Sequence, residues 1–480
     1  MRLIQTQGVP ELPAVQKFDV TVPVVIIGGG ACGLTAALTL KDAGVESVVL
    51  ERDAVPQGST ALSSGFIPAC GTRWQRAIGV TDAMDMLAAD VERKNHNESR
   101  PDVVRAACAA SAPTLEWLAD AHGIPFHVLE GFLYPGHGVP RMHAVPEKTG
   151  AGLIGRLTAA AERAGVDLIT EAPVSGLYVE ADQRIVGVRI TRADGSVEDI
   201  GCQALILACN GYGGNRAMVR QYIPEIADAE YAGHAGNQGD AVRWGQLLGA
   251  AIADMGAYQG HGSWATPHGQ LVTWALMVEG GIQVNCEGLR FWDEQQGYSE
   301  ASQHVIAQPG KFAWNIYDRR LHELGMTFPD YAELVKAGAI RDAMTAGALA
   351  AQIQVPAGAL DETLREVETM QHGGAADPFG RDFTTRPALD APYYAVKVTG
   401  ALFHTQGGLE IDPTTRVLRT DGSPLPNLYA GGGAARGISG AHVWGYLSGN
   451  GLLTAVSQGR IAGLQVAEAL RAASQATAGS

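Results

Sequence analysis

The chain has 480 residues, of which 46% are hydrophobic and 18% are charged. This length favours two domains over one simple core, and the composition indicates a well-packed globular protein rather than a disordered one. A formal net charge of −15 disfavours nucleic acid or an anionic membrane surface as a partner. We see no signal peptide and no apolar run long enough to span a membrane, so we expect a cytoplasmic protein.

The cysteines show no CxxC pair and no metal-type spacing: Cys32, Cys70, Cys108, Cys202, Cys209 and Cys286. Reduced, mostly buried thiols are the default for such a set in an intracellular enzyme. We therefore expect neither a metal site nor a disulfide framework.

After a leader at 1–20, expected to be a short strand or arm, residues 24–51 have the pattern of a β–α–β unit. The β-branched run 24–27 is typical of a parallel strand covered on both faces. Three glycines then follow at GxGxxG spacing, at Gly28, Gly30 and Gly33. They allow a tight turn, the approach of a pyrophosphate to the backbone, and close packing of the next helix.

A second apolar strand at 48–50 ends in Glu51, where a carboxylate can accept a hydrogen bond from a ribose hydroxyl. The helix N-terminus between the strands offers N–H groups and a partial positive charge to phosphates. The unit therefore predicts a dinucleotide site, since a plain glycine-rich turn leaves the acid at this spacing unexplained. The small-residue loop 57–65 follows, and we favour its contact with a planar cofactor ring over a plain surface turn.

The next elements alternate between helices and strands. Periodic apolar residues predict helices within 81–123 that stop at Gly123, then a helix at 152–164 and a strand at 166–170. Alternating stretches predict a three-stranded antiparallel meander at 174–179, 186–191 and 197–202, with a hairpin turn at 193–195.

Two later strands, at 204–209 and 428–430, each open into a glycine loop like that of the first unit. The fold class is therefore α/β, with a Rossmann-like dinucleotide domain that combines a parallel sheet with a small antiparallel meander. Residues 256–403 differ in composition and contain a helical patch at about 330–372, which indicates an inserted α+β cap domain. The predicted domains are 1–255 and 404–480 for the first and 256–403 for the insert.

At this point the chain resembles, over nearly its whole length, the soluble flavoproteins of the fumarate reductase and 3-ketosteroid dehydrogenase family. The matching motifs are GxGxxG with Glu51, Ser63-Ser64-Gly65, Ala208-Cys209-Asn210-Gly211, Gly239-Asp240-Ala241, the stretch 284–294, 404–408, and Asn450 through Gly463. The resemblance implies FAD as the cofactor. The membrane-bound members attach FAD through a histidine in the early serine loop, and none stands at 57–65, so we expect non-covalent FAD.

The resemblance implies a set of cofactor-binding residues from the motifs and their neighbours. They are Gly28, Gly30, Ala31, Cys32, Gly33, Glu51, Arg52, Ser59, Thr60, Ser63, Ser64, Gly65, Val174, Ala208, Cys209, Asn210, Gly211, Asn215, Asp240, Gly432, Gly433, Asn450, Gly451 and Leu452.

The chain departs from the fumarate reductases at two positions where they carry arginine. The first falls at Tyr298 and the second at or next to Tyr446. Losing both guanidinium groups removes bidentate recognition of a dicarboxylate. Tyrosines in exchange resemble the ketosteroid dehydrogenases, whose tyrosine hydroxyls hold a ketone and take a proton. The Tyr-x-Ser-Gly arrangement at 446–449 looks most like the branch that desaturates a 5α-reduced ketosteroid.

Desaturation beside a carbonyl needs a base for the acidified proton, donors for the enolate oxygen and a hydride acceptor, which FAD would supply. The catalytic candidates are Tyr298, Tyr446, Ser448 and His404, with Tyr298 favoured as the base. A tyrosine, with a pKa of about 10, needs a neighbour that stabilises its phenolate. Ser448 or the backbone at Gly449 could complete the oxyanion site, and His404 could equally be a residue that only holds a flavin loop.

The candidate substrate-binding residues are His261, Gly449, Arg141 and Trp444. His261 matches a substrate-side histidine of the fumarate reductases, and Arg141 could bind a substrate carboxylate if its loop folds over the cavity, although a solvated loop is the simpler reading. Aromatic residues of the insert could line a ring-binding pocket or form the insert's own core: Tyr258, Trp264, Trp274, Phe291, Trp292, Tyr298 and Trp314.

The sequence thus favours an FAD-dependent dehydrogenase that introduces a double bond next to the carbonyl of a cyclic ketone. The substrate would be a 3-ketosteroid or a smaller cyclohexanone such as 4-oxocyclohexanecarboxylate, with oxygen or another carrier as external electron acceptor. A fumarate-reductase-type ene-reductase acting on an unsaturated acid is the alternative. A redox-responsive flavoprotein without turnover is the minor one.

Overall fold

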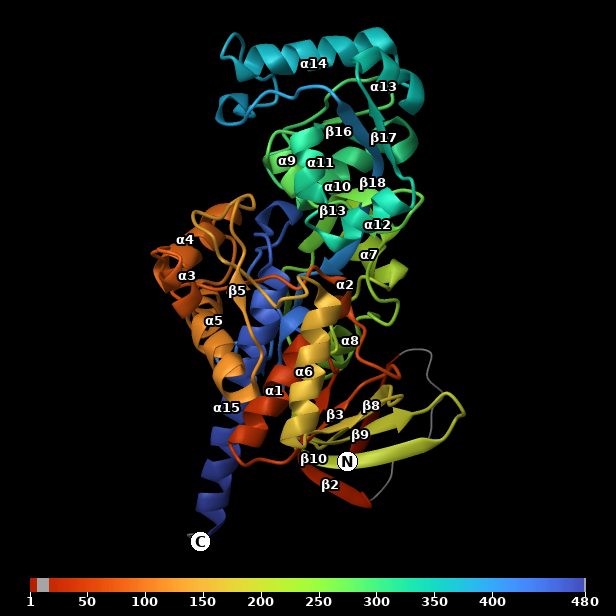
Figure 1. Ribbon diagram of the computed structural model, residues 1–480. Coiled ribbons are helices and arrows are strands. Elements are labelled where there is room, and N and C mark those ends of the chain that lie inside the picture. Colours follow the sequence, from red (N-terminus) through yellow and green to blue (C-terminus); the bar gives the residue numbers. More distant parts are fainter. Residues whose placement is uncertain (7–16, 479–480) are drawn as a thin grey trace.

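The computed structural model describes residues 1–6 and 17–478 and has two lobes, as Figure 1 shows. The lower lobe contains both chain ends and the upper lobe contains the middle of the chain. The leader forms a strand, β1 (Arg2–Gln5), while the rest of its predicted span at 7–16 lies outside the described residues. No helix among the described residues is long and apolar enough to cross a membrane.

The lower lobe is built on a sheet that has nine strands within the described residues. Its parallel part contains β2 (Val20–Ile27), β3 (Ser47–Leu50), β7 (Asp167–Ile169), the second half of β10 (Val197–Leu207) and β21 (Pro424–Ala430). Its antiparallel part contains β1, β8 (Val174–Val179), β9 (Ile185–Thr191), the first half of β10, and β20 (Arg416–Leu418), which pairs with β21. The predicted α/β class, with a meander beside a parallel sheet, is confirmed.

The meander differs from the prediction in one respect. The strands expected at 197–202 and 204–209 form a single strand, β10, which pairs antiparallel with β9 through residues 197–201 and parallel with β21 through residues 205–207. The polar residue Gln203 lies between these two parts and does not interrupt the extended backbone. The hairpin turn at 193–195 is present, with Gly195 at φ 84°.

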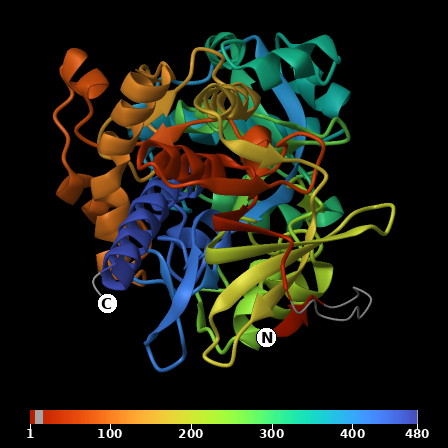
Figure 2. The same ribbon diagram turned by 90° about the horizontal axis from the view of Figure 1, so that it is seen from below.

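The helices outside the predicted insert differ in place: α1 contacts β2 and β3, α6 and α15 pack on α1, and α7 lies beside the upper lobe (Figures 1 and 2). Their bounds are α1 (Ala31–Asp42), α2 (Ser59–Leu62), α3 (Arg73–Ala77), α4 (Met84–Lys94), α5 (Pro101–His122), α6 (Gly150–Ala164), α7 (Arg216–Tyr222), α8 (Asp240–Leu247) and α15 (Asn450–Ala478). The helix α5 ends at Gly123, whose φ of 68° gives the left-handed C-cap that the sequence predicts. Short strands β4 (Ile67–Pro68), β5 (His127–Val128) and β6 (Met142–Ala144) form a small separate sheet.

The upper lobe has its own sheet of seven strands within the described residues. They are β11 (Glu230–Tyr231), β13 (Tyr258–Ala265), β14 (Gln270–Leu271), β15 (Ile282–Val284), β16 (Ala313–Asp318), β17 (Ile340–Ala343) and β18 (Tyr393–Thr405). The strand β11 joins this sheet from before the predicted boundary at residue 255. A two-stranded ladder of β12 (Ile252–Ala253) and β19 (Gly408–Leu409) lies at the connection between the lobes.

The helices of the upper lobe are α9 (Ala275–Val278), α10 (Tyr298–Ile306), α11 (Arg319–Gly325), α12 (Pro329–Lys336), α13 (Ala346–Ile353) and α14 (Ala357–Gln371). The helical patch predicted at 330–372 is therefore three helices interrupted by β17. Most of the insert's aromatic residues pack into this lobe, and only Trp274 and Tyr298 of the seven named above are among the described residues that line the main cavity.

The packing of α1 requires glycine on two sides. A Cβ at Gly33 would collide with the carbonyl oxygen of Gly28. Glycine at 33 therefore allows the start of α1 to lie against the turn after β2. A Cβ at Gly459 of α15 would collide with the carbonyl of Cys32, and one at Gly463 would collide with Thr39. Figure 2 shows α1 and α15 as neighbours. This backbone contact fixes the position of the α1 N-terminus.

We predict that Gly33→Ala destabilises the fold by about 3 kcal/mol or more, because the added methyl must displace backbone rather than a flexible side chain. Chemical unfolding of the variant measures this loss. Gly155→Ala is the matched control, since a Cβ at Gly155 meets no atom within 4 Å on the exposed face of α6. That control is expected to be neutral or to stabilise by up to about 1 kcal/mol, and equal effects of the two substitutions would contradict the packing argument.

Candidate active site

A cavity of about 520 Å³ runs from the N-terminus of α1 into the space between the two lobes. Its lining brings together most of the residues that the sequence singled out. Those from the predicted cofactor set are Gly28, Gly30, Ala31, Cys32, Glu51, Arg52, Ser59, Thr60, Ser63, Ser64, Gly65, Val174, Ala208, Cys209, Asn210, Asp240, Gly432, Gly433, Gly451 and Leu452. Those from the predicted catalytic and substrate set are Tyr298, Tyr446, Ser448, His404, His261 and Gly449.

Backbone N–H groups line the dinucleotide end of the cavity and hold its acidic residue in place. The cap residue Gly30 offers no side chain to the first turn of α1, so N–H groups of that turn remain available for phosphate oxygens. Glu51 accepts hydrogen bonds from the N–H of Gly29 at 2.8 Å and of Asp53 at 3.1 Å. These bonds fix the carboxylate beside the glycine turn, as a ribose-binding acid requires. The residues present therefore fit a dinucleotide such as FAD.

A second segment, residues 232–240, lies over this end. Arg52 donates to the carbonyl of Gly236 at 2.5 Å and pairs with Asp240 at 3.4 Å. His234 lies 3.0 Å from the carboxylate of Asp53. Asp240 thus contacts Arg52 and lines the cavity.

Four predicted cofactor residues are not among the described lining residues: Gly33, Gly211, Asn215 and Asn450. Each has a supporting contact instead. Gly33 allows α1 to pack, and Gly211 lies against Thr405. Asn215 caps α7 by accepting from Ala217 and Met218, and the buried Asn450 donates to Ser439 at 3.2 Å. These residues shape the loops that form the cavity rather than its wall.

The other end of the cavity contains a group of hydroxyls. Tyr298 stands at the start of α10, in the upper lobe, and its ring lies 6.1 Å from that of Tyr446, in the loop before α15. The side chains of Tyr446 and Ser448 and the N–H of Gly449 lie near enough to the Tyr298 hydroxyl to influence its pKa. The N–H groups of Gly451 and Gly449 act in the same way on the hydroxyl of Tyr446. The two lobes thus meet at a pair of phenols.

Burial raises the pKa of both phenols. It raises the pKa of Tyr446 to about 12, and the N–H groups of Gly451 and Gly449 and the hydroxyl of Tyr298 limit this rise. Burial also raises the pKa of Tyr298 well above its ordinary value, and the nearby Tyr446 adds to the effect. Two backbone N–H groups thus favour a phenolate on Tyr446.

The two histidines of this end are held neutral. Burial lowers the pKa of His261 to about 3 and that of His404 to about 4. His261 stacks on the ring of Tyr298 at 4.8 Å, and its Nδ1 accepts from the N–H of Ser263. Gln406 lies 3.1 Å from the Nδ1 of His404, which itself packs edge-on against Tyr446. Neither imidazole offers a positive charge to a carboxylate at neutral pH.

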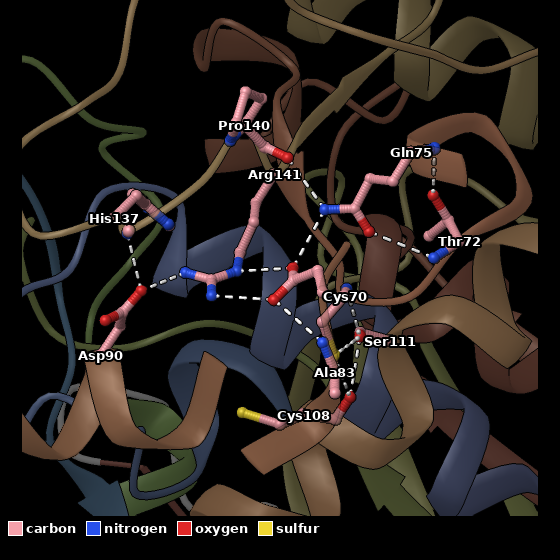
Figure 3. Close-up of polar contacts among 12 residues, drawn as sticks. Cys70, Thr72, Gln75, Ala83, Asp90, Cys108, Ser111, His137, Pro140 and Arg141 are labelled. Atoms are coloured by element: carbon pink, nitrogen blue, oxygen red, sulfur yellow. Dashed lines mark hydrogen bonds and ion pairs between the residues drawn. The ribbon is translucent and has the colours of Figure 1, made fainter. Parts of the chain in front are cut away.

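The structure corrects the expectation that Arg141 binds a substrate carboxylate. Its guanidinium is 2% exposed and donates to both oxygens of Asp82, at 2.7 and 2.9 Å, and to Asp90 (Figure 3). With both carboxylates supplied by the chain, this cation has no free face for a ligand, and it is not among the described residues that line the main cavity. Through these ion pairs, Arg141 holds the end of its loop in place.

Trp444 is also placed differently from the expectation. Its side chain is 38% exposed, stacks on His442 at 4.0 Å and is not among the described lining residues. The neighbouring Tyr446 enters the cavity because the backbone turns between the two residues at 443–445, in a short 3₁₀ segment.

Sequence reasoning missed several wall residues near the phenols: Tyr134, Gln259, Leu271, Thr273, Phe328, Asp330 and Phe403. Tyr134 is partly buried beside Tyr298, with ring centroids 6.3 Å apart, and lies close to Thr273. A tyrosine in the Gly/Pro-rich loop 134–140 was the available signal for the first of these. The arginine and lysine in the described lining are Arg52 and Lys148, and Lys148 lies two residues before Gly150, whose N–H donates to Ser63 beside the dinucleotide end.

Comparisons with known proteins agree with this geometry. The chain belongs to the FAD binding domain family, whose model matches residues 23–452. A probable fumarate reductase, Ifc3, of Shewanella frigidimarina is 28% identical over 445 residues, which cover 92% of this chain and 74% of that protein. The protein is thus an FAD-dependent oxidoreductase of the group that contains fumarate reductases and ketosteroid dehydrogenases, as the motifs predict.

Two solved structures share the whole fold. The open conformation of a flavocytochrome c3 fumarate reductase matches with a TM-score of 0.78 and 28% identity, covering 94% of this chain and 79% of that one. A 3-ketosteroid-Δ4-(5α)-dehydrogenase from Rhodococcus jostii RHA1, in complex with 4-androstene-3,17-dione, matches with a TM-score of 0.76 and 25% identity, covering 94% and 98%. Both similarities extend over the two lobes, so the Rossmann-like domain with its inserted cap domain is confirmed.

We predict that Glu51→Gln weakens FAD binding by about tenfold or more, since an amide can accept only one of the two backbone N–H bonds and loses the charge. Titration of the apoprotein with FAD measures the affinity. Glu46→Gln is the matched control, because the Glu46 side chain is 67% exposed and pairs with the surface residue Lys41. Equal FAD affinity in the Glu51 and Glu46 variants would remove the assigned role of Glu51.

Proposed function

We propose that this protein desaturates a cyclic ketone, removing one hydrogen from the carbon next to the carbonyl group and one from the adjacent carbon. The observation that carries the proposal is the meeting of Tyr298, Tyr446 and Ser448 at one end of the cavity, where the described lining contains no arginine or lysine. Phenols and N–H groups suit a carbonyl oxygen and a transferred proton, whereas a dicarboxylate requires cations.

We assign Tyr446 as the base and Tyr298 as the donor to the ketone oxygen, reversing the order that the sequence favours. The N–H groups of Gly449 and Gly451 lie beside the Tyr446 hydroxyl and favour a phenolate there. Burial and the neighbouring Tyr446 raise the pKa of Tyr298, so Tyr298 retains its proton, which it can share with a developing enolate oxygen. Ser448, beside Tyr298, can orient that hydroxyl.

The reaction is balanced by one hydride and one proton. The Cα–H bond breaks toward Tyr446, the adjacent C–H bond breaks with its electron pair, and a C=C bond forms between the two carbons. FAD, which we expect to be bound non-covalently, supplies the acceptor for the hydride. An external electron acceptor, such as oxygen or another carrier, must then take the two electrons.

The walls favour an uncharged ring as substrate. The phenol end is lined by aromatic side chains from both lobes: Tyr134, Trp274, Phe328, Phe403 and the two tyrosines. The neutral His261 and His404 and the fully paired Arg141 leave a carboxylate at this end without a cation. We therefore favour a 3-ketosteroid or an unsubstituted cyclohexanone over 4-oxocyclohexanecarboxylate. The neighbouring ketosteroid dehydrogenase structure, which contains a steroid dione, supports the same class.

The second candidate is reduction of an unsaturated acid, which the similarity to the probable fumarate reductase of Shewanella favours. Anaerobic mixing distinguishes the two. Bleaching of the oxidised flavin by a saturated cyclic ketone supports desaturation. Reoxidation of the reduced protein by an enoate, without bleaching by any ketone, would establish the reductase instead. If neither happens, a redox-responsive flavoprotein without turnover becomes the better description.

We predict that Tyr446→Phe and Tyr298→Phe each slow flavin bleaching by about a hundredfold or more while FAD remains bound, as expected for the loss of an acid–base group. Stopped-flow absorbance measures the rate. Tyr317→Phe is the control, because Tyr317 is a buried phenol bonded to Tyr331 and is not among the described cavity-lining residues. Unchanged rates in both active-site variants would overturn the assignment.

We also predict that bleaching becomes faster as the pH rises from 6 to 9, by up to about tenfold per unit, because a base whose pKa is raised to about 12 is almost fully protonated throughout this range. No inflection is expected near pH 6.5, since His261 and His404, with pKa values lowered to about 3 and 4, stay neutral. A pH–rate profile of single-turnover bleaching tests both points. An inflection between pH 6 and 7 that disappears in His404→Gln would assign the base to histidine.

A further inference from the structure

The last turn of α4 contacts all three segments that bring a tyrosine into the cavity. We call residues Asp90, Arg93, Lys94 and Asn95 the α4 hub. None of these residues is among the described cavity-lining residues, so the hub cannot act on a ligand directly. Its contacts reach the loop of Tyr134, the start of α10 at Tyr298, and the loop that leads to Tyr446.

The first contact is with the Gly/Pro-rich loop that carries Tyr134. The carboxylate of Asp90 accepts from the N–H of Gly138 at 2.8 Å and from Arg141, as Figure 3 shows for the arginine. Arg93 donates to the carbonyl of Gly136 at 3.0 Å. These bonds hold the loop on both sides of His137, whose Nε2 donates to the carbonyl of Ser448 at 2.9 Å. The hub therefore also supports Ser448, through one intermediate residue.

The second contact joins the two lobes. Lys94 forms an ion pair with Glu300 and donates to the carbonyl of Gln296 at 2.9 Å. Both side chains are largely buried, at 14% and 9% exposure. The two acceptors lie on either side of Tyr298 in the sequence. One ammonium group therefore holds the first turn of α10, which begins with Tyr298. Gly297 is required in between, since a Cβ there would meet the Glu300 carboxylate and its φ is 142°.

The third contact is with the loop before α15. The fully buried Asn95 donates to the carbonyl of Ile438 at 3.0 Å and to Ser99 at 2.6 Å. A Cβ built on Gly445 would lie only 2.9 Å from the Cβ of Asn95. The backbone next to Tyr446 therefore packs directly on Asn95. The three tyrosines thus come from separate segments, and one helical turn sets their positions.

We infer that the α4 hub positions the acid–base groups of the site, and that Lys94 is the positioning residue that sets Tyr298 of the upper lobe against Tyr446 of the lower lobe. This rests on the proposed function for its kinetic consequence, but not for its structural one. A phenol displaced by about 1 Å can slow proton transfer by about a hundredfold. The wall residues Leu271, Thr273 and Phe328, whose segments none of the hub contacts named above involves, would still hold the ketone.

Lys94→Met in the FAD-loaded full chain tests this inference. We expect amide hydrogen exchange in residues 296–302 to become about tenfold faster, because the start of α10 loses its anchor. We expect single-turnover bleaching at saturating ketone to become about tenfold slower or more, while the ketone KM changes by less than about threefold. Lys94→Arg keeps the cation and is expected to recover most of both properties.

Lys311→Met is the matched control. Lys311 also pairs with an acid across the predicted domain boundary, Asp228 at 2.9 Å, but both side chains are exposed, at 56% and 79%. Its exchange in 296–302 and its bleaching rate should equal those of the unmodified protein. Should Lys94→Met fail to retain FAD, the same two measurements on Lys94→Arg and Glu300→Gln replace it, with smaller changes in the same direction.

Wild-type exchange in 296–302 of a folded Lys94→Met protein would overturn the inference, whatever the substrate. So would a loss of bleaching that appears only as a higher KM. If no ketone bleaches the unmodified protein, the proposed function fails while the exchange measurement still decides the role of Lys94. The two failures are therefore distinguishable.

Discussion

Backbone contact around α1 is the constraint on which the rest of the molecule depends. Glycine at 28 and 33 lets the helix begin directly on the turn after β2, and glycine at 459 and 463 lets α15 lie against its other side. The first contact places N–H groups at the dinucleotide end of the cavity. The second fixes the start of α15, and with it the loop of Tyr446 and Ser448. Helix packing thus sets the spacing between the dinucleotide end of the cavity and the hydroxyls of Tyr446 and Ser448.

Charge is distributed in a way that follows from this plan. The buried cations of the chain are paired within the protein, as Arg141 is with Asp82 and Asp90, and Lys94 with Glu300. The described lining contains arginine and lysine at the dinucleotide end, where phosphates need them, and the phenol end is left with neutral donors. An aromatic end of the cavity without arginine or lysine suits a ketone, whose oxygen gains negative charge only as the proton leaves.

Most of the cofactor end could be predicted from the sequence, because it is made by contiguous motifs whose spacing reflects backbone geometry. Tyr298 and Tyr446 could be placed because they replace arginines at fixed distances from such motifs. Tyr134 and Thr273 could not, since each lies in an irregular loop whose path depends on tertiary contacts with α4 and α10. Arg141 was misplaced because its partners, Asp82 and Asp90, lie more than 50 residues earlier, and a lone arginine near a glycine loop looks free in the sequence.

The α4 hub and the remaining walls belong to different parts of the chain. Leu271, Thr273, Phe328 and Asp330 reach the cavity from β14, the segment before α9 and the start of α12, and none of the hub contacts described above involves them. The segments that position the proposed acid–base groups are therefore different from the segments that form the rest of the wall around a ligand. Ligand size and polarity can change through these wall segments during evolution or in the laboratory while the acid–base geometry is inherited intact.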